Sequence, residues 1–306
     1  MDDITVRAPT LDDAPAVAAL IAARDRADFA EADPIGFTGD ELRDWWARDA
    51  AALATDAWIA VAGGEVVAFA RVGAERDLAN VEDESCVHPE ARGRGLGSEL
   101  LDRAESWAHE RGLARMQMHV VNDDGRQLAQ DRGHELVRYF WRMEIDLASG
   151  APELAQPEGV TIRAYRPGDD DEGLHAAHQE AFAEHWEFTP EPLDEWRKRR
   201  GRSDYHPDLW WLAMDGDEVA GAVLCFGERH FGWVLDLFVV PRFRRRGLGL
   251  ALLESGFHGL RERGHTHAGL EVDSENETGA TRLYERAGMR VTRRYATYEK
   301  PLGAGA

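Results

Sequence analysis

Two short segments of the 306-residue sequence combine arginine and glycine in a spacing suited to an anionic ligand. Residues 92–97 read Arg-Gly-Arg-Gly-Leu-Gly, and residues 244–249 read Arg-Arg-Arg-Gly-Leu-Gly. Each segment follows a proline and precedes an amphipathic run, so each is predicted to open a helix. Unpaired N–H groups at a helix N-terminus bind anions, and glycines let the ligand approach the backbone. A pyrophosphate is the natural ligand of such a loop.

Two common nucleotide-binding loops do not fit these segments. A Walker loop requires Gly-Lys-Ser/Thr, and a Rossmann loop requires a third glycine. The first motif is missing here, and the third-glycine positions hold Ser98 and the pair Leu250-Ala251. The other alternative is a helix start that merely carries surface arginines. Because the loop occurs twice in matching context, we favour anion binding.

The residues around both loops resemble the signature of the GNAT superfamily of N-acyltransferases. That signature is a strand ending in Val-x-Pro, then Arg/Gln-x-x-Gly-x-Gly/Ala opening a helix, and it is present at 87–97 and 239–249. The resemblance implies acetyl-CoA as acyl donor, with its pantetheine arm along the strand and its pyrophosphate on the loop. The implied cofactor-binding residues are Leu237, Phe238, Val239, Arg244, Arg245, Arg246, Gly247, Leu248 and Gly249, and in the first half Ser85, Cys86, Val87, Arg92, Gly93, Arg94, Gly95, Leu96 and Gly97.

The second half also resembles the family's second motif. Residues 270–276 read Leu-Glu-Val-Asp-Ser-Glu-Asn, and residues 279–289 contain Leu-Tyr-Glu-Arg-Ala-Gly-Met. The resemblance implies that Tyr284 lies near the cofactor sulfur and protonates the leaving thiolate, and that Asn276 contacts the pantetheine region. One extra residue between them departs from the commonest spacing. The alternative interpretation of Tyr284 is an aromatic side chain that packs a helix on the sheet.

An amine nucleophile needs a general base. An amine with a pKa near ~10 is mostly protonated at neutral pH, so a general base has to remove its proton, directly or through water. Glu271 and Asp236 are the candidates, on strands that we expect to be neighbours. Either one could instead face solvent or pair with an arginine.

The first half lacks the corresponding groups. Gln117 stands where the second half has Glu271, and Ala129 stands where it has Tyr284. An amide takes up no proton, and alanine has none to give. We therefore predict that the first half binds CoA without catalysis, although Glu84, at the position of Asp236 in the repeat, leaves a catalytic first half open.

The segment between the first two helices of the second half is expected to shape the acceptor pocket. His185, Trp186 and Glu187 lie in it, and aromatic side chains beside carboxylates suit a cationic amine. A helix start packed by aromatic residues is an equal alternative.

Three histidines of the second half could be metal ligands. His175 and His178 could share a helix face with His185, but no fourth ligand accompanies them, so we predict no metal site. The basic run 197–202 is interpreted as a solvated face.

An internal repeat sets the domain organisation. Beyond the loops, 4–8 matches 160–164, and 58–66 matches 211–219. Residues 147–159 resemble a linker, which gives domains at 1–146 and 160–302. In the second half we predict strands at 160–165, 209–214, 218–226, 233–240 and 267–273, a terminal strand, and helices at 171–184, 191–200, 246–263 and 278–287. This order indicates a mixed α/β sheet in each of two GNAT-like domains.

Composition narrows the function classes. The formal net charge of −21 disfavours nucleic acid, whose binding relies on Lys and Arg. No leader or membrane-spanning run is recognisable, so we expect a cytoplasmic protein that does not bind membranes. Cys86 and Cys225 lie in apolar runs and are predicted to be reduced thiols.

The leading interpretation is acetyl-CoA-dependent N-acetylation of a small amine by direct transfer, with catalysis in the second half. We expect a monomer or a homodimer whose partner is that small-molecule substrate. A protein or peptide N-acetyltransferase is one alternative. A non-catalytic sensor of acyl-CoA, with both loops occupied and neither turning over, is the other.

Overall fold

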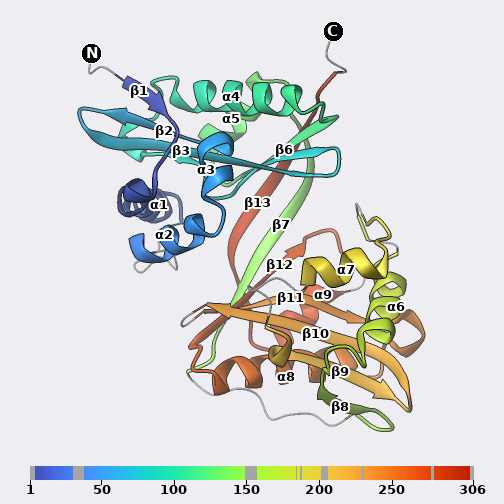
Figure 1. Ribbon diagram of the computed structural model, residues 1–306. Helices are drawn as coiled ribbons and strands as arrows, with labels where there is room; N and C mark the ends of the chain where they lie inside the picture. The colour runs from blue at the N-terminus through green and yellow to red at the C-terminus, as the bar shows by residue number, and fades with distance from the viewer. Residues whose placement is uncertain are drawn as a thin grey trace. The chain divides into compact units, whose positions relative to one another are not determined.

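The computed structural model describes residues 4–29, 38–148, 157–183, 185–186, 188–200, 206–228, 231–276 and 279–303 (Figure 1). Its internal contacts divide the chain into two compact units. Unit 1 comprises residues 1–140 and 293–306, and unit 2 comprises residues 141–292. Both units combine helices with a mixed parallel and antiparallel sheet, which confirms the predicted fold class.

In unit 1 the hydrogen-bonded strand order is β1-β2-β3-β4-β6-β13, and β5 pairs with β3 outside this path. Strands β4 and β6 run parallel, whereas the other neighbours are antiparallel. The elements are β1 (Ile4–Arg7), η1 (Leu11–Asp13), α1 (Ala14–Phe29), α2 (Gly39–Ala47), α3 (Ala50–Asp56), β2 (Ala57–Ala62), β3 (Glu65–Glu75), β4 (Leu78–Val81), β5 (Cys86–Val87), η2 (Pro89–Ala91), α4 (Leu96–Glu110), β6 (Arg115–Val120), α5 (Asp123–Asp131) and the first part of β7 (Glu135–Asp146).

The strand alternation of unit 1 explains how helices cover both faces of its sheet. Successive side chains of a strand point to opposite faces. On β3, Phe69 packs in a buried cluster with Val17 of α1 and Leu42 of α2. Its neighbour Ala68 packs in a different cluster with Leu100 of α4. Helices α1 and α2 therefore cover one face and α4 covers the other.

In unit 2 the strand order is β7-β12-β11-β10-β9-β8. Strands β8 to β11 are antiparallel neighbours, and β11 runs parallel to β12. Every helix and strand predicted for the second half is present, with bounds within a few residues. The elements are β8 (Thr161–Ala164), α6 (Asp171–Phe182), α7 (Leu193–Arg200), η3 (Pro207–Leu209), β9 (Trp210–Asp215), β10 (Glu218–Glu228), β11 (Phe231–Val239), η4 (Pro241–Phe243), α8 (Leu248–Glu262), β12 (His267–Asp273), α9 (Ala280–Arg286) and β13 (Arg290–Pro301).

The last strand of each repeat contributes to the sheet of the other. Strand β7 ends the first repeat, but its residues 141–146 belong to unit 2, where β7 neighbours β12. Strand β13 ends the second repeat, but from Arg293 onward it belongs to unit 1 and pairs antiparallel with β6. The two units therefore differ from the sequence-based division at 1–146 and 160–302 by a reciprocal exchange of terminal strands.

Three smaller expectations concern the linker, the cysteines and the membrane. Residues 149–156 of the expected linker lie outside the described residues, whereas Leu147 is fully buried and its N–H donates to Thr266 O over 2.7 Å. Cys86 and Cys225 are both free thiols in the described residues. Within the described ranges, no helix has the length and apolar character needed to cross a membrane.

Candidate active site

In unit 2 the predicted anion-binding loop joins β11 to α8. Gly247 precedes α8 with a φ of 81°, in the left-handed region that glycine adopts without steric cost. Gly95 precedes α4 of unit 1 in the same conformation, with a φ of 82°. Each loop therefore lies at a helix N-terminus, where the first N–H groups have no partner within the helix and can bind an anion.

The three arginines of the unit 2 loop differ in their surroundings. Arg244 donates from Nε to Val239 O over 3.1 Å and from Nη2 to Ala181 O over 3.3 Å. Arg246 forms an ion pair of 3.2 Å with the aspartate that ends β9. Arg245 is exposed and has a φ of 65°, unusual for a residue with a side chain. Arg244 thus fixes the loop to the end of β11, whereas Arg245 extends toward solvent.

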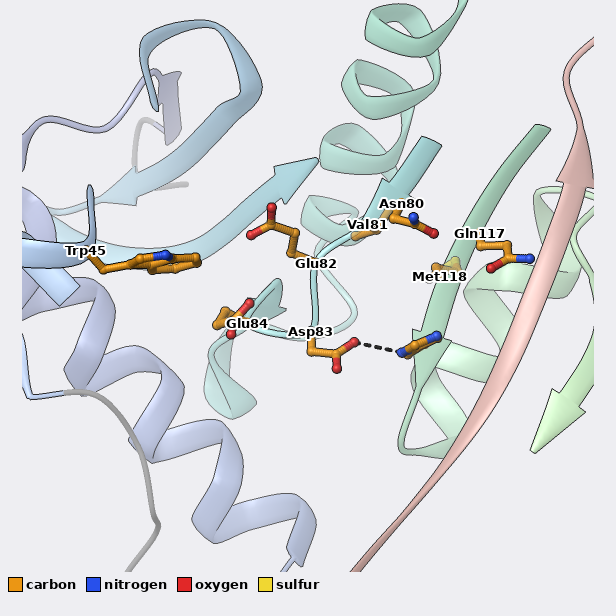
Figure 2. A pocket seen from close by; sticks show the side chains of 9 residues that line it. Trp45, Asn80, Val81, Glu82, Asp83, Glu84, Gln117 and Met118 are labelled. Atoms are coloured by element: carbon orange, nitrogen blue, oxygen red, sulfur yellow. Dashed lines mark ion pairs between the residues drawn. The ribbon is translucent and has the colours of Figure 1, made fainter. Parts of the chain in front are cut away.

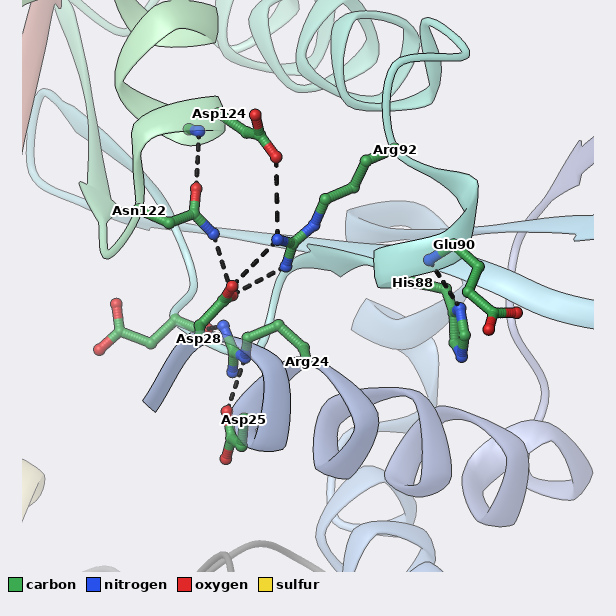
Figure 3. A network of polar contacts seen from close by, with 10 residues as sticks. Arg24, Asp25, Asp28, His88, Glu90, Arg92, Asn122 and Asp124 are labelled. Carbon is green, nitrogen blue, oxygen red and sulfur yellow. Dashed lines mark hydrogen bonds and ion pairs between the residues drawn. The ribbon is translucent and has the colours of Figure 1, made fainter. Parts of the chain in front are cut away.

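In unit 1 the first arginine of the loop is neutralised by a carboxylate. Arg92 donates from Nη1 and Nη2 to Asp28 of α1 over 3.0 and 2.8 Å, and Asn122 donates to the same carboxylate over 2.9 Å (Figure 3). The Asp28 side chain is only 4% exposed. Arg92 therefore anchors the loop to α1. A contact between Arg92 and a phosphate of the ligand stays a prediction. Arg94 of the same loop is exposed.

The last glycine of each loop allows two helices to pack closely. A Cβ atom on Gly249 would lie 2.8 Å from Leu283 Cδ1 of α9, and one on Gly97 would lie 3.1 Å from Leu128 Cδ2 of α5. Both distances are shorter than ordinary van der Waals contact between carbon atoms. In unit 2 this packing holds α9, and with it Tyr284, against the helix that follows the loop.

Parallel strands separate beside each loop. In unit 2, β11 pairs with β12 only from Phe231 to Trp233, so the edge of residues 237–239 has no partner strand on that side. In unit 1, β4 pairs with β6 only from Leu78 to Val81, after which the chain leaves β6. Backbone N–H and C=O groups freed in this way require hydrogen-bonding partners. An extended ligand with amide groups, such as a pantetheine arm, can supply them.

The residues proposed for proton transfer in unit 2 lie in different surroundings. Tyr284 on α9 is 8% exposed and belongs to the main hydrophobic core, so it also packs as the alternative interpretation expects. Burial raises the pKa of its phenol to about 12, and the phenol keeps its proton at neutral pH. Glu271 on β12 is exposed. Asn276 follows β12, and its N–H donates to Asp273 O over 3.1 Å.

Asp236 on β11 lies in a buried ion cluster. Its carboxylate accepts a hydrogen bond of 2.6 Å from Arg200 of α7 and lies 3.5 Å from His178 Nε2 of α6. Although burial alone would raise the pKa of Asp236, the bonds from His178 and Arg200 hold it well below its usual range. An ionised carboxylate with so low a proton affinity is a weak base. The cluster therefore argues for a positioning role of Asp236.

One residue of the expected acceptor segment, His185, packs against the last residue of α6, Phe182, whose ring packs against β11. His185 lies 5.5 Å from the Phe182 ring, and Phe182 lies 5.8 Å from the Phe238 ring of β11. Trp186 is partly buried, and its carbonyl lies 3.1 Å from His185 Nδ1. Glu187 lies outside the described residues. His185 is thus linked to Phe238 through the ring of Phe182, and a role of His185 and Trp186 in acceptor binding stays a prediction.

Unit 1 fills the corresponding positions differently. Gln117 donates from Nε2 to Glu299 of β13 over 2.7 Å. Ala129 shares a buried cluster with Tyr298, also of β13. At the position that corresponds to Tyr284, the small side chain of Ala129 therefore packs in a cluster with Tyr298 of the terminal strand.

Sequence reasoning missed the residues that surround Asp236. The run 197–202 was interpreted as a solvated face, which is wrong for Arg200, because that residue is only 5% exposed. His178 and His175 had been weighed only as metal ligands. His178 lies beside Asp236, and His175 Nε2 lies 2.8 Å from Glu191 O. The described residues contain no group of three or more potential ligands suited to a metal ion.

Comparison with known proteins decides the family. The model of the acetyltransferase (GNAT) family matches this chain twice, at residues 21–130 and 172–289. The chain belongs to this family. The mycothiol acetyltransferase of Geodermatophilus obscurus is 33% identical over 251 residues, which cover 79% of each chain. That of Salinispora arenicola is 32% identical over 291 residues, which cover 92% of each chain. The chain is an N-acetyltransferase with tandem GNAT domains.

Solved structures agree with this assignment. A GCN5-related N-acetyltransferase from Sphaerobacter thermophilus is 34% identical, has a TM-score of 0.86, and matches over 99% of this chain and 97% of its own. A tandem GNAT protein from the clavulanic acid biosynthesis pathway covers 99% of this chain and 100% of its own, with a TM-score of 0.70. Its sequence is 16% identical, so this likeness shows the shared fold.

Proposed function

We propose that this N-acetyltransferase transfers the acetyl group of acetyl-CoA directly to a small amine, and that unit 2 performs the catalysis. The observation that carries the proposal is the position of Tyr284. Its phenol keeps its proton, and its helix packs against the helix of the glycine-arginine loop through Leu283 and Gly249. Unit 1 has the same loop but carries Ala129 at the corresponding position.

Each residue of unit 2 has a distinct role in the proposed reaction. Acetyl-CoA supplies a thioester whose carbonyl is open to an amine. Backbone N–H groups along residues 237–239 bind the pantetheine arm and polarise that carbonyl, while the loop at Gly247 binds the pyrophosphate. Glu271, exposed on β12, takes the amine proton directly or through water. Tyr284 donates a hydrogen bond to the leaving thiolate, and Asn276 contacts the pantetheine region.

Two features of Tyr284 and Asp236 refine this assignment. A phenol with a pKa of about 12 is a weaker acid than a thiol, whose pKa is near ~8.5, so Tyr284 acts first as a hydrogen-bond donor to the thiolate. Asp236 is occupied by Arg200 and His178, so we propose Glu271 as the base and assign Asp236 to positioning Arg200.

The acceptor site is proposed to lie at His185 and Trp186, above β11. The tandem layout, with Tyr284 in the second half and Ala129 at the matching position of the first, also resembles mycothiol synthase. The relatives described as mycothiol acetyltransferases match most of the chain at about a third identity. The acceptor of those enzymes is therefore the first substrate to test, followed by other small amines.

A thiol-release assay with acetyl-CoA tests the proposal. We expect Tyr284→Phe to lower kcat by about 10² to 10³, with little change in the KM for acetyl-CoA, because the lost proton donor acts in the transition state. Tyr139→Phe, an exposed tyrosine of unit 1, is the matched control and should leave kcat unchanged. Full activity of Tyr284→Phe would contradict catalysis in unit 2. Acetyl-CoA binding without thiol release for any amine would instead identify a sensor.

A further inference from the structure

Strand alternation places Glu271 of unit 2 on the same face of the sheet as Trp233 of β11. Trp233 is the register partner of Gly269, and residues two apart on a strand point to the same face, so Trp233, Gly269 and Glu271 share a face. Gly232 lies on the opposite face, because a Cβ atom there would lie 2.5 Å from Leu260 Cδ2 of α8. The face that carries Glu271 is therefore the one that α8 does not cover.

Gly269 leaves room on this face for a side chain of the exchanged strand β7. A Cβ atom on Gly269 would lie 2.8 Å from Phe231 Cζ and 3.4 Å from Glu144 Cγ. Glu144 belongs to the part of β7 that neighbours β12 in unit 2. A carboxylate from the first repeat therefore reaches the strand that carries Glu271.

A buried arginine holds Glu144 in place. Arg142 Nε lies 2.7 Å from Glu144 Oε1, and the two residues are 6% and 9% exposed. The Arg142 guanidinium lies 4.5 Å from the ring centre of Trp233 and 5.2 Å from that of Phe231, which are cation–π distances. The two rings and the ion pair therefore fix both charged side chains, since either charge alone would be costly at this depth.

Unit 1 carries a different pair at the corresponding positions. Glu299 corresponds to Glu144, because each is the tenth residue of its terminal strand, and Gln117 corresponds to Glu271. Gln117, which also lines the pocket drawn in Figure 2, is 4% exposed and donates to Glu299, its direct register partner. Glu271 is exposed. An amide at this place thus turns inward to the terminal strand, whereas a carboxylate stays in solvent.

We propose that Glu144 is a positioning residue of the unit 2 site, and that its charge keeps the Glu271 carboxylate in solvent, where an amine can reach it. The inference rests on the proposed function, in which Glu271 is the base. Like charges on neighbouring strands repel, so Glu271 lowers its energy by turning away from Glu144. The strand exchange thereby gives the proposed base of the second repeat a partner from the first.

An amide at position 144 would reverse this effect. In Glu144→Gln the new amide can donate to Glu271, as Gln117 donates to Glu299 in unit 1. Arg142 would lose the charge of Glu144 and gain Glu271 as its counter-ion. Both changes draw the Glu271 carboxylate toward β7 and away from the amine.

Chemical labelling of carboxyl groups in the full chain tests the position of Glu271 without any acceptor. Glycinamide with a water-soluble carbodiimide couples to carboxyl groups that solvent reaches, and peptide mass spectrometry measures the labelled fraction. Glu271 should be labelled in the parent chain and in Glu144→Asp, which keeps the charge, and several-fold less in Glu144→Gln. Exposed Glu285 of α9 is the internal standard. Equal labelling of Glu271 in the parent and in Glu144→Gln would overturn the proposal.

Acetyl-transfer kinetics test the consequence for the reaction, with acetyl-CoA and the fastest acceptor among butylamine, glucosamine and spermidine. Glu144→Gln should lower kcat by about tenfold at an unchanged KM for acetyl-CoA, whereas Glu144→Asp should retain kcat. Glu172→Gln, at an exposed residue of α6, is the control. In a Glu271→Gln background, Glu144→Gln should have no further effect, because its target is already missing. An equal loss of kcat in that background would show a structural role and overturn the proposal.

The roles of Glu271 and Glu144 can fail separately. Full activity of Glu271→Gln would contradict Glu271 as the base of the proposed function, and the labelling would still decide whether Glu144 positions it. If Glu144→Gln fails to fold, Arg142→Met/Glu144→Gln removes both charges and leaves no unpaired ion in the buried pair. This double variant should show the same fall in Glu271 labelling, and unchanged labelling in it would overturn the proposal.

Discussion

The side-chain amide of Gln117 donates a hydrogen bond of 2.7 Å to Glu299, although the two residues are 182 positions apart in the chain. They are direct partners in the antiparallel register of β6 and β13. Arg115 binds the same carboxylate over 3.0 Å. Where unit 2 has Glu271, unit 1 therefore has an amide that supports a carboxylate from the terminal strand.

Gln117→Glu should destabilise unit 1. It would place a second carboxylate beside Glu299 at a position that is 4% exposed, at a cost of about 1 to 3 kcal/mol. Urea unfolding at pH 7 measures the loss, and lowering the pH to 4 should reduce it because protonation removes the repulsion. Gln130→Glu, the same change at an exposed site on α5, is the control. Equal losses in both variants would contradict the assigned role of Gln117.

The fold was predictable from the sequence because its signals are local. The glycine-arginine loop, the hairpin residues and the strand alternation occur within short windows and occur twice, so they identify the family and the order of elements. The exchange of β7 and β13 has no such signal. Both strands follow the same kind of helix in the repeat, and either could complete either sheet. Only partners distant in sequence, such as Gln117 and Glu299, distinguish the two arrangements.

The candidate site was predictable in part for the same reason. Tyr284 and Gly247 belong to contiguous motifs, so their residue types and spacing were informative. Asp236 and Arg200 were not recognised as a pair, because α7 reads as a charged surface helix and the burial of one arginine within it depends on tertiary packing.

Asp236→Asn should destabilise unit 2 because it removes the counter-charge of Arg200. The change leaves the charge of Arg200, whose side chain is 4% exposed, without its carboxylate, at a cost of about 3 to 5 kcal/mol. The folded-state pKa of Asp236 lies below its unfolded value, so its contribution is present above about pH 4 and disappears as the pH falls further. Thermal unfolding from pH 7 down to pH 2 should show the two proteins converging. Asp217→Asn, at an exposed turn, should follow the parent throughout.

A comparison of Gly247→Ala with Gly264→Ala should distinguish the effect of backbone strain from the effect on acetyl-CoA binding. Gly247 and Gly264 have φ values of 81° and 89°, and a Cβ atom at either position would meet nothing within 4 Å. Alanine should therefore cost about 1 kcal/mol or more of stability at both sites. Only Gly247→Ala should weaken acetyl-CoA binding, as measured by calorimetry, because only that glycine shapes the loop. Equal affinities of the two variants would exclude the loop from the pyrophosphate site.

Arg92→Ala should lower the free energy of unfolding far more than Arg94→Ala, although the two residues are close in the chain. Loss of Arg92 leaves the buried Asp28 without its bidentate partner, and we expect a destabilisation of about 3 kcal/mol. Arg94 is exposed, and its removal should change the free energy of unfolding by less than about 0.5 kcal/mol. Chemical denaturation of both variants provides the comparison. A stable Arg92→Ala chain would show that Asp28 needs no cation.

The exchanged strand β13 also constrains how the chain is made. The ribosome releases β1 to β6 long before β13, the strand that pairs with β6 in their sheet. At ~5 to 20 residues per second, residues 141–292 take about 8 to 30 seconds to synthesise, and throughout that time β6 has an unpaired edge. The first half of the nascent chain therefore stays incompletely folded until β13 has emerged, and a chain terminated before β13 would leave the sheet of unit 1 unfinished.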